Sequence, residues 1–185
     1  MSRYQCLNKQ IYQNSEFKIV PIRFSDKYKI LKWRNEQIFH LRQNKILTKE
    51  DQDFYFSNVI DKIFEQVKPT QILFSFLKNG KCVGYGGLVH INWIDYNAEI
   101  SFLIDTKLQK NSFDEFWTNY LELIELVAFD DLRLHKIYTF AFDLRENLYK
   151  VLEKNKFNLE CRFKEHILYQ NKYIDAVVHS KFNSN

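Results

Sequence analysis

The spacing of apolar residues divides the first third of the chain into one strand and two helices. EFKIVPIR, residues 16–23, predicts a first strand, and apolar residues then recur at helical spacing over residues 25–37 and again after Thr48. We expect Ser25 to cap the first of these helices. The T-x-x-D spacing of Thr48 and Asp51 is typical of a capping box on the second.

From Gln71 onward the apolar residues repeat with the period of two that strands show. QILFSFLK and CVGYGGLVHI flank Asn79-Gly80, a pair typical of tight hairpin turns, and AEISFLID adds a third strand. We therefore predict an antiparallel meander over residues 71–105. Its middle strand contains Gly84, Gly86 and Gly87. Glycines inside a strand mark a bulge or the close approach of another backbone or of a ligand.

The last part of the chain alternates helices and strands. A continuous apolar stripe predicts a helix over residues 113–130. HKIYTFAF, residues 135–142, lacks polar alternation, so we expect a strand that is buried on both faces. Asp143 begins a further helix with a D-x-x-E capping pattern, and two strands joined by a Gln170-Asn171 turn end the chain.

The resulting order of elements is β-α-α-β-β-β-α-β-α-β-β. This order predicts a single α/β domain over residues 1–185, with an ordered core of about residues 16–182. We expect a mixed, mostly antiparallel sheet with helices on both faces.

Composition excludes several classes of protein. The excess of 27 basic over 23 acidic residues is small and spread along the chain, so we expect no nucleic-acid partner. The three cysteines are isolated and form no CxxC pair, which gives neither a disulfide framework nor a metal site. We therefore expect a reducing, cytoplasmic compartment and no metal. No signal-peptide core and no apolar run of about 18 residues occurs, so we expect no membrane partner.

Four stretches resemble the GNAT acyltransferase superfamily in their order and spacing, from about Phe17 to Phe182. They are LKWRNEQ, NAEISFLID, YKVLEKNKF and NKYIDAVVHSKF. The first is similar to a motif of the ribosomal-protein alanine acetyltransferase branch and of sugar-nucleotide N-acetyltransferases from bacterial surface-glycan pathways. NAEISFLID resembles the fourth strand of the superfamily, and YKVLEKNKF its fourth helix. The resemblance implies acetyl-CoA as the acetyl donor and a primary amine as the acceptor.

The resemblance also implies where the cofactor binds. The fourth and fifth strands of such proteins splay apart, and pantetheine in the gap would pair with the backbone of Phe102, Leu103 and Ile104. The pyrophosphate would rest on the following loop and helix start. The residues concerned are Gln109, Lys110, Asn111, Ser112 and Phe113.

This loop lacks both glycines that relatives have, and Ser112 and Asp114 stand in their place. Ser112 and Glu115 match a capping box, which competes with a phosphate for the same backbone N–H groups. We therefore expect a weak phosphate grip, or one that Lys107 and Lys110 supply.

Acetylation requires a neutral amine, so a base must lie close to the acceptor. Glu99 is the candidate, because the alanine acetyltransferase branch has an acidic group on this strand and apolar neighbours predict a partly desolvated carboxylate. The alternative is a salt-bridged structural glutamate. His90, near the end of the preceding strand, is a candidate second base or substrate contact. Many relatives have, where this chain has Leu152, a tyrosine that acts as general acid for the leaving thiolate, although the alanine acetyltransferase branch lacks it. Tyr149, one turn earlier, is the candidate substitute.

Five further residues complete the implied site. Arg145 stands where relatives have a cofactor-contacting asparagine, and Asn147 follows two residues later. Trp33 and Arg34 lie on the helix that borders the acceptor cleft, where Arg34 could bind an acceptor phosphate or carboxylate. Trp93 is a candidate wall for a planar acceptor. For each of these residues, packing or a local ion pair is the alternative.

We therefore expect an acetyl-CoA-dependent N-acetyltransferase that acts on a small-molecule amine, with an amino-sugar nucleotide of a bacterial surface-glycan pathway as the first choice. A protein N-terminal amine is the alternative acceptor. A degenerate GNAT domain that binds acyl-CoA or a partner protein without catalysis is the alternative of another class. A homodimer is left open.

Overall fold

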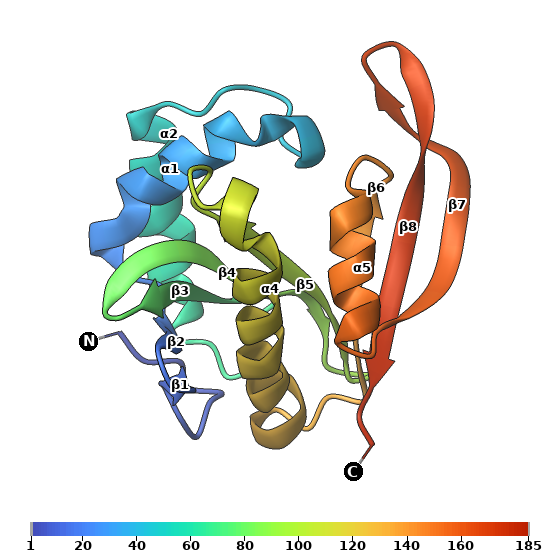
Figure 1. Ribbon diagram of the computed structural model, residues 1–185. Coiled ribbons are helices and arrows are strands. Elements are labelled where there is room, and N and C mark those ends of the chain that lie inside the picture. Colours follow the sequence, from blue (N-terminus) through green and yellow to red (C-terminus); the bar gives the residue numbers. More distant parts are fainter. Residues whose placement is uncertain (1, 185) are drawn as a thin grey trace.

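The computed structural model describes residues 2–184, without the side chains of Lys110 and Asn111, and it confirms the predicted α/β class (Figure 1). Its eight-stranded sheet has the order β1-β2-β3-β4-β5-β6-β8-β7. The strands are β1 Tyr12–Gln13, β2 Phe17–Pro21, β3 Ile72–Lys78, β4 Lys81–Asn92, β5 Asn97–Ile104, β6 Lys136–Phe142, β7 Asn158–Tyr169 and β8 Lys172–Phe182. Neighbouring strands pair antiparallel, except that β5 and β6 are parallel.

The helices are α1 Lys27–Glu36, α2 Lys49–Tyr55, α3 Asp61–Ile63, α4 Gln109–Glu125 and α5 Glu146–Lys154. Short segments flank them: 3-10 turns η1 Phe24–Asp26 and η2 Ile38–His40, and π-helical segments η3 Phe56–Ile60 and η4 Leu126–Asp131. In Figure 1, α1 and α2 lie together, α4 crosses the middle of the sheet, and the β7–β8 hairpin extends beyond the helices. None of the described helices combines the length and the apolar character needed to cross a membrane.

The predicted meander is confirmed as β3, β4 and β5. Asn79 and Gly80 form its first turn with φ values of 49° and 78°, a backbone conformation that favours Asn-Gly. Helix α4 packs on the meander through Tyr120, whose ring stacks on Phe102 at 3.7 Å. A Cβ at Gly86 would lie 2.1 Å from the Ser101 carbonyl oxygen and 2.7 Å from the Tyr120 hydroxyl. The close approach that this glycine indicates is therefore to neighbouring protein atoms.

The sheet is split between its two parallel strands. β5 and β6 pair only through Asn97–Glu99 and Lys136–Tyr138, and both strands then continue without a shared ladder. The prediction that residues 135–142 are buried on both faces is wrong. Burial alternates along β6, because Phe140 and Phe142 border the split and stay partly exposed.

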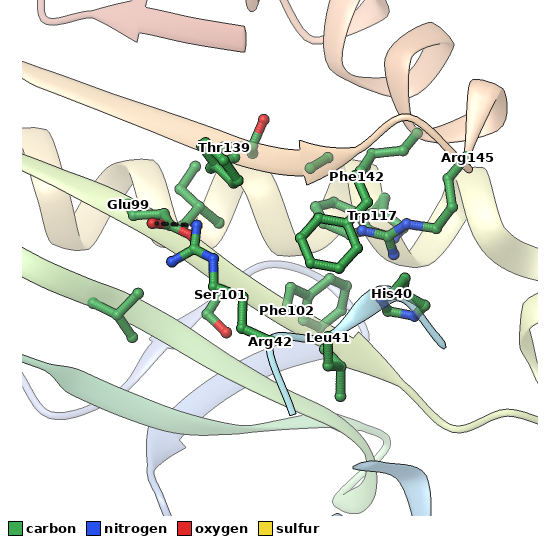
Figure 2. Close-up of a pocket in the computed structure, with 15 residues that line it drawn as sticks. His40, Leu41, Arg42, Glu99, Ser101, Phe102, Trp117, Thr139, Phe142 and Arg145 are labelled. Carbon is green, nitrogen blue, oxygen red and sulfur yellow. Dashed lines mark hydrogen bonds and ion pairs between the residues drawn. The ribbon is translucent and has the colours of Figure 1, made fainter. Parts of the chain in front are cut away.

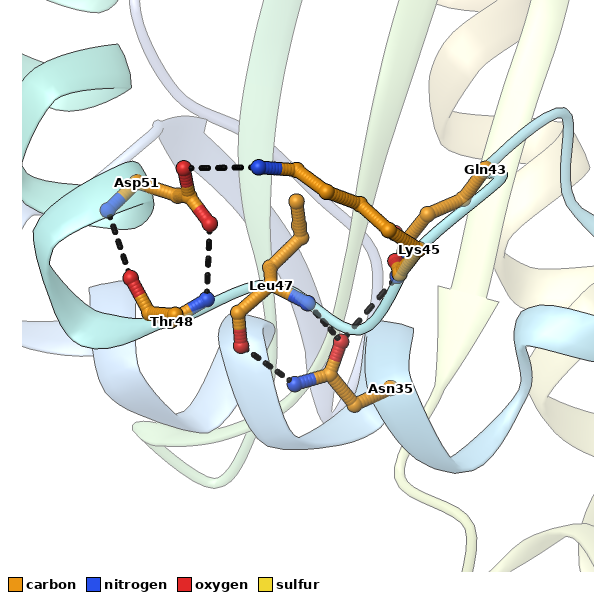
Figure 3. Close-up of polar contacts among 6 residues, drawn as sticks. All are labelled: Asn35, Gln43, Lys45, Leu47, Thr48 and Asp51. Carbon is orange, nitrogen blue, oxygen red and sulfur yellow. Dashed lines mark hydrogen bonds and ion pairs between the residues drawn. The ribbon is translucent and has the colours of Figure 1, made fainter.

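The predicted helix starts are confirmed only in part. Thr48 and Asp51 form the capping box at α2 (Figure 3). Ser25 lies inside η1 and makes no side-chain cap, so that prediction is wrong. Asp143 does not cap α5 either, because its carboxylate accepts from the Tyr149 hydroxyl and pairs with Arg162.

Candidate active site

Two cavities lie along the split. The first has a volume of about 180 Å³ and lies between residues 99–102 of β5 and residues 139–142 of β6, beside residues 40–42 (Figure 2). The second has a volume of about 670 Å³ and lies between the starts of α4 and α5. Arg145 lines both cavities.

Three buried polar atoms on residues that line the first cavity have no hydrogen-bond partner among the described residues. They are His40 Nδ1, Thr139 Oγ1 and Arg145 Nε. Buried polar atoms in folded proteins are normally hydrogen-bonded, so atoms without partners on residues around a cavity indicate a place for a polar ligand.

The free edge of β5 can pair with an extended ligand. The carbonyl oxygens of Ser101 and Leu103 point toward β4. A Cβ at Gly86 would lie 2.1 Å from the Ser101 oxygen, and one at Gly84 would lie 2.6 Å from the Leu103 oxygen. Main-chain groups alternate along a strand, so those of Phe102 point into the split. The Ile104 carbonyl points the same way but already accepts a hydrogen bond from Gln37 Nε2 at 2.9 Å. Of the three predicted cofactor-pairing residues, Phe102 therefore offers the open donor and acceptor.

Glu99 lies at the closed end of the split, where it is only 9% exposed. Arg42 Nη2 lies 3.1 and 3.2 Å from its two carboxylate oxygens, and His90 Nδ1 lies 3.0 Å from Oε2. The guanidinium of Arg42 also lies over the Phe140 ring, 4.5 Å from its centre. The expected burial of Glu99 is confirmed, but its surroundings are charged, as in the alternative interpretation. Arg42 thus holds the Glu99 carboxylate at the edge of the first cavity.

A bulge in β4 directs His90 toward Glu99. Val89 pairs with Glu99 and Asn92 with Asn97, so two residues of β4 lie opposite one residue of β5. His90 takes a φ of 50° there, as bulge residues do when they redirect a side chain. The side chain of His90 is 62% exposed and does not line the first cavity, so its link to the site is Glu99.

The loop that carries Arg42 is held by the end of α1 (Figure 3). Asn35 donates to the Leu47 carbonyl at 2.8 Å, and its Oδ1 accepts from the Leu47 N–H at 2.9 Å and from Gln43 Nε2 at 3.0 Å. Arg34 Nε donates to Gln43 Oε1 at 3.1 Å, and Trp33 is buried in the core. The structure therefore uses the Trp33-Arg34-Asn35 stretch to support the loop, and neither Trp33 nor Arg34 lines either of the two cavities along the split.

Trp93 and Tyr149 also lie away from both cavities. Trp93 Nε1 donates to the Pro69 carbonyl at 2.8 Å. The Tyr149 hydroxyl donates to Asp143 Oδ1 at 2.9 Å, and its ring stacks on His179. Burial and the Asp143 carboxylate raise the pKa of Tyr149. The structure thus gives these two side chains contacts within the protein, and their contacts with ligands stay predictions.

The loop before α4 does not form the predicted capping box. The Ser112 N–H donates to the Leu108 carbonyl at 3.2 Å, and Ser112 leaves the helical conformation with a φ of −137°. The Glu115 carboxylate pairs instead with Lys78 Nζ at 2.5 Å. That prediction is wrong, and Lys78 offsets the negative charge that Glu115 places near the helix start.

The predicted phosphate-binding residues are only partly brought together. Gln109 and Phe113 line the second cavity, and Gln109 donates to the Gln37 side chain. Asn147 lines the same cavity from α5. The predicted contacts of Lys110 and Asn111 lie outside the described side chains. Lys107 is exposed and lines neither cavity.

Arg145 and His40 lie close to one another in the first cavity, near Trp117 (Figure 2). Burial lowers the pKa of Arg145 to about 10. Burial, together with the charge of Arg145, lowers the pKa of His40 to about 3, so its imidazole stays neutral at neutral pH. No group of three or more His, Cys, Asp or Glu side chains in the described part of the chain could hold a metal ion.

Sequence reasoning missed Gln37, His40, Arg42 and Trp117. Gln37 is the last residue of LKWRNEQ, from which only Trp33 and Arg34 are predicted as site residues. His40 and Arg42 follow in a segment with no short motif, and a contact with Glu99 across 57 residues leaves no local pattern. Trp117 was assigned to the apolar stripe of its helix, where it does pack, but it also lines the first cavity.

Comparison with known proteins gives one family and one fold. The profile of the acetyltransferase (GNAT) domain matches residues 19–178. Among solved structures, spermidine N-acetyltransferase from Vibrio cholerae in complex with CoA and spermine has a TM-score of 0.77 and 18% identity, over 92% of this chain and 98% of that chain. The dodecameric intermediate-state structure of spermidine N-acetyltransferase from Vibrio cholerae has a TM-score of 0.75 and 19% identity, over 92% and 96%. A probable acetyltransferase has a TM-score of 0.71 and 18% identity, over 93% and 96%.

Proposed function

The chain belongs to the GNAT acetyltransferase family, which uses acetyl-CoA as its donor, and from this premise we propose that it acetylates the primary amine of a small molecule that also carries negative charge. The charge of the first cavity carries the proposal. Among its described lining residues, Glu99 is the only acid, and the basic Arg42 lies beside it at the closed end of the split. An amino-sugar nucleotide combines an amine with a diphosphate, and it is our first choice.

Two of the three solved structures described above are named for spermidine N-acetyltransferase, one of them with spermine bound, and both amines are polycations. A polycation needs several acidic groups for binding, and the first cavity offers one carboxylate that Arg42 already pairs with. The charges of this chain therefore favour an anionic acceptor over a polyamine.

The donor fits the split. The main-chain N–H and C=O of Phe102 would pair with the pantetheine arm as with an added strand. Gln109, Phe113, Arg145 and Asn147 line the second cavity, which would hold the phosphate end. When bound, acetyl-CoA supplies an acetyl thioester at the closed end of the split.

Glu99 acts as the base in this proposal. It takes a proton from the acceptor ammonium, because only the neutral amine has the lone pair that attacks the thioester carbon. The half-exposed side chains of Arg42 and His90 leave this end open to an acceptor from solvent. An anionic group of the acceptor would draw Arg42 away from Glu99 and free the carboxylate. A thiol with a pKa near 8.5 leaves readily as a thiolate, so no positioned acid is required.

Two steps test the proposal. Calorimetry measures acetyl-CoA binding first, and CoA release is then compared among amino-sugar nucleotides, spermidine, and peptides beginning with Ala or Ser. We expect the highest kcat/KM with an amino-sugar nucleotide. Faster turnover of spermidine would contradict the anionic acceptor, and absence of acetyl-CoA binding at millimolar concentration would contradict the enzyme.

A further inference from the structure

Arg145 is a half-buried cation whose Nε is fully buried, and it lacks a counterion in the described part of the chain. Its Nε has no hydrogen-bond partner, and no carboxylate lies within ion-pair distance of its guanidinium. Buried charges in folded proteins are paired or bind a ligand, because an isolated one is poorly solvated. The lowered pKa of Arg145 reflects the same burial.

The nearest acids have other roles. Asp143 accepts from the Tyr149 hydroxyl and pairs with Arg162. Glu146 is exposed in the first turn of α5, and Glu153 lies 3.9 Å from His179. The fold therefore places a positive charge beside the split without a counterion from the described residues, which leaves it able to bind an anionic ligand.

The position of Arg145 indicates which part of a ligand it meets. Glu99 lies at the closed end of the split, and the five residue steps from Glu99 to Ile104 cover about 17 Å of strand. Arg145 follows the far end of β6 and lines both the narrow first cavity and the wider second one. A donor whose thioester reacts beside Glu99 reaches Arg145 with its opposite end.

The second cavity has further features that favour an anion. It lies between the starts of α4 and α5, and the N-terminal end of a helix carries partial positive charge. Lys78 pairs with Glu115 and offsets its negative charge near the start of α4, so this carboxylate repels an anion there less strongly. Asp143 and Glu146 line the same cavity. The Asp143 carboxylate pairs with Arg162, whereas Glu146 acts against an anion.

We infer that Arg145 binds the pyrophosphate of acetyl-CoA and so takes over the role of the glycines that are missing from residues 109–114. The inference rests on the proposed use of acetyl-CoA. It assigns the phosphate contact to the β6–α5 side of the split, opposite the loop that carries this contact in the relatives that the sequence resembles.

The test compares acetyl-CoA with S-acetylpantetheine, which has the same arm and no phosphate. Affinities are measured by calorimetry and by ligand-observed NMR for the wild type, Arg145→Gln and the control Arg133→Gln, which removes an exposed arginine outside both cavities. We expect Arg145→Gln to weaken acetyl-CoA binding about 10- to 100-fold and to leave S-acetylpantetheine within about twofold. Arg133→Gln should change neither affinity. The wild type could also fail to bind S-acetylpantetheine, which would mean that the phosphate end supplies the affinity. This result supports the inference if Arg145→Gln also weakens acetyl-CoA binding.

Two further measurements separate a ligand contact from a structural role. Without cofactor, Arg145→Gln should raise the Tm, because it removes a buried unpaired charge. Glu146→Gln should tighten acetyl-CoA by about twofold to fivefold, because it removes a negative charge from the same cavity.

Unchanged acetyl-CoA affinity in Arg145→Gln, or an equal loss for both ligands, would overturn the inference and leave the proposed function intact. If the wild type itself does not bind acetyl-CoA, the proposed function fails, and the inference fails with it.

Discussion

Arg42 Nη2 lies 3.1 and 3.2 Å from the two carboxylate oxygens of Glu99, although the two residues are 57 positions apart. Arg42 belongs to the loop after α1, and Glu99 lies where β5 and β6 begin to separate. The loop therefore covers the candidate base with a cation. In the proposed mechanism, a neutral amine forms beside Glu99 only when that cation has another partner, which the proposed anionic acceptor would supply.

Replacing Arg42 tests this role. We expect Arg42→Gln to lower kcat/KM for an anionic acceptor by about 10- to 100-fold, because a charged hydrogen-bond donor is lost. Acetyl-CoA affinity, measured by calorimetry, should stay within about twofold. The ion pair is partly exposed, so the free energy of unfolding should fall by only about 1 kcal/mol or less.

The matched control for Arg42 is Lys45→Gln, which removes a cation from the same loop. Its kcat/KM should equal that of the wild type. Equal losses in the two variants would mean that the loop acts through its general charge and that Arg42 has no specific role.

Asn35 is expected to act through the position of the loop. Asn35→Ala removes three hydrogen bonds to Leu47 and Gln43, and we expect urea unfolding to show a loss of about 1–3 kcal/mol. The KM of the acceptor should rise with it, because Arg42 is no longer held. Asn58→Ala removes one exposed bond on the η3 segment and should affect stability only slightly and KM not at all. A change in stability without a change in KM would separate the loop from acceptor binding.

His40 gives the fold a pH dependence of known sign. Its folded pKa of about 3 lies below the unfolded value of about 6.5, so the unfolded chain binds more protons between these values and stability falls as pH falls from 6.5 toward 3. At about 1.4 kcal/mol per unit, the step from pH 6.5 to pH 4.5 costs about 2–3 kcal/mol. Arg145 and the Gln37 amide face this imidazole.

Urea unfolding at the two pH values checks this expectation. His40→Gln should reduce the difference, and His179, whose pKa burial also lowers, should supply part of what remains. His135→Gln, which changes an exposed imidazole, should keep the full difference. An unchanged slope in His40→Gln would assign the pH dependence to other groups.

Tyr149 is expected to be dispensable for turnover. Its hydroxyl is bonded to Asp143 and it lines neither cavity, so Tyr149→Phe should change kcat by less than about threefold. The lost hydrogen bond should lower the free energy of unfolding by about 1 kcal/mol. A drop in kcat of a hundredfold, measured by CoA release at saturating substrates, would restore Tyr149 as the acid.

Elements with strong local signals were predictable from the sequence. The Asn79-Gly80 turn and the period of two around it are sufficient for the β3–β4–β5 meander, and Thr48 and Asp51 are sufficient for the capping box at α2. The capping box expected at Ser112 and Glu115 has the same kind of signal and is wrong. Lys78, from β3, takes the Glu115 carboxylate, and no pattern near Glu115 reveals that partner.

The candidate site depends on contacts of this long-range kind. Glu99 and Phe102 were predictable because a resemblance placed their strand beside the split. Arg42 and the unpaired state of Arg145 were not, because the first needs the path of the loop and the second needs the positions of every nearby acid. The sequence therefore predicts the strand order, whereas the charges around the site become clear only from the folded structure.

The central claim is that Glu99 takes the proton of the acceptor amine, and Glu99→Gln tests it most directly. The measurement is the single-turnover rate of acetyl transfer at saturating acetyl-CoA, with the acceptor that gives the fastest CoA release in the panel. We expect Glu99→Gln to lower this rate by about 100- to 10,000-fold, with acetyl-CoA affinity within about twofold of the wild type. A rate equal to that of the wild type would contradict the account.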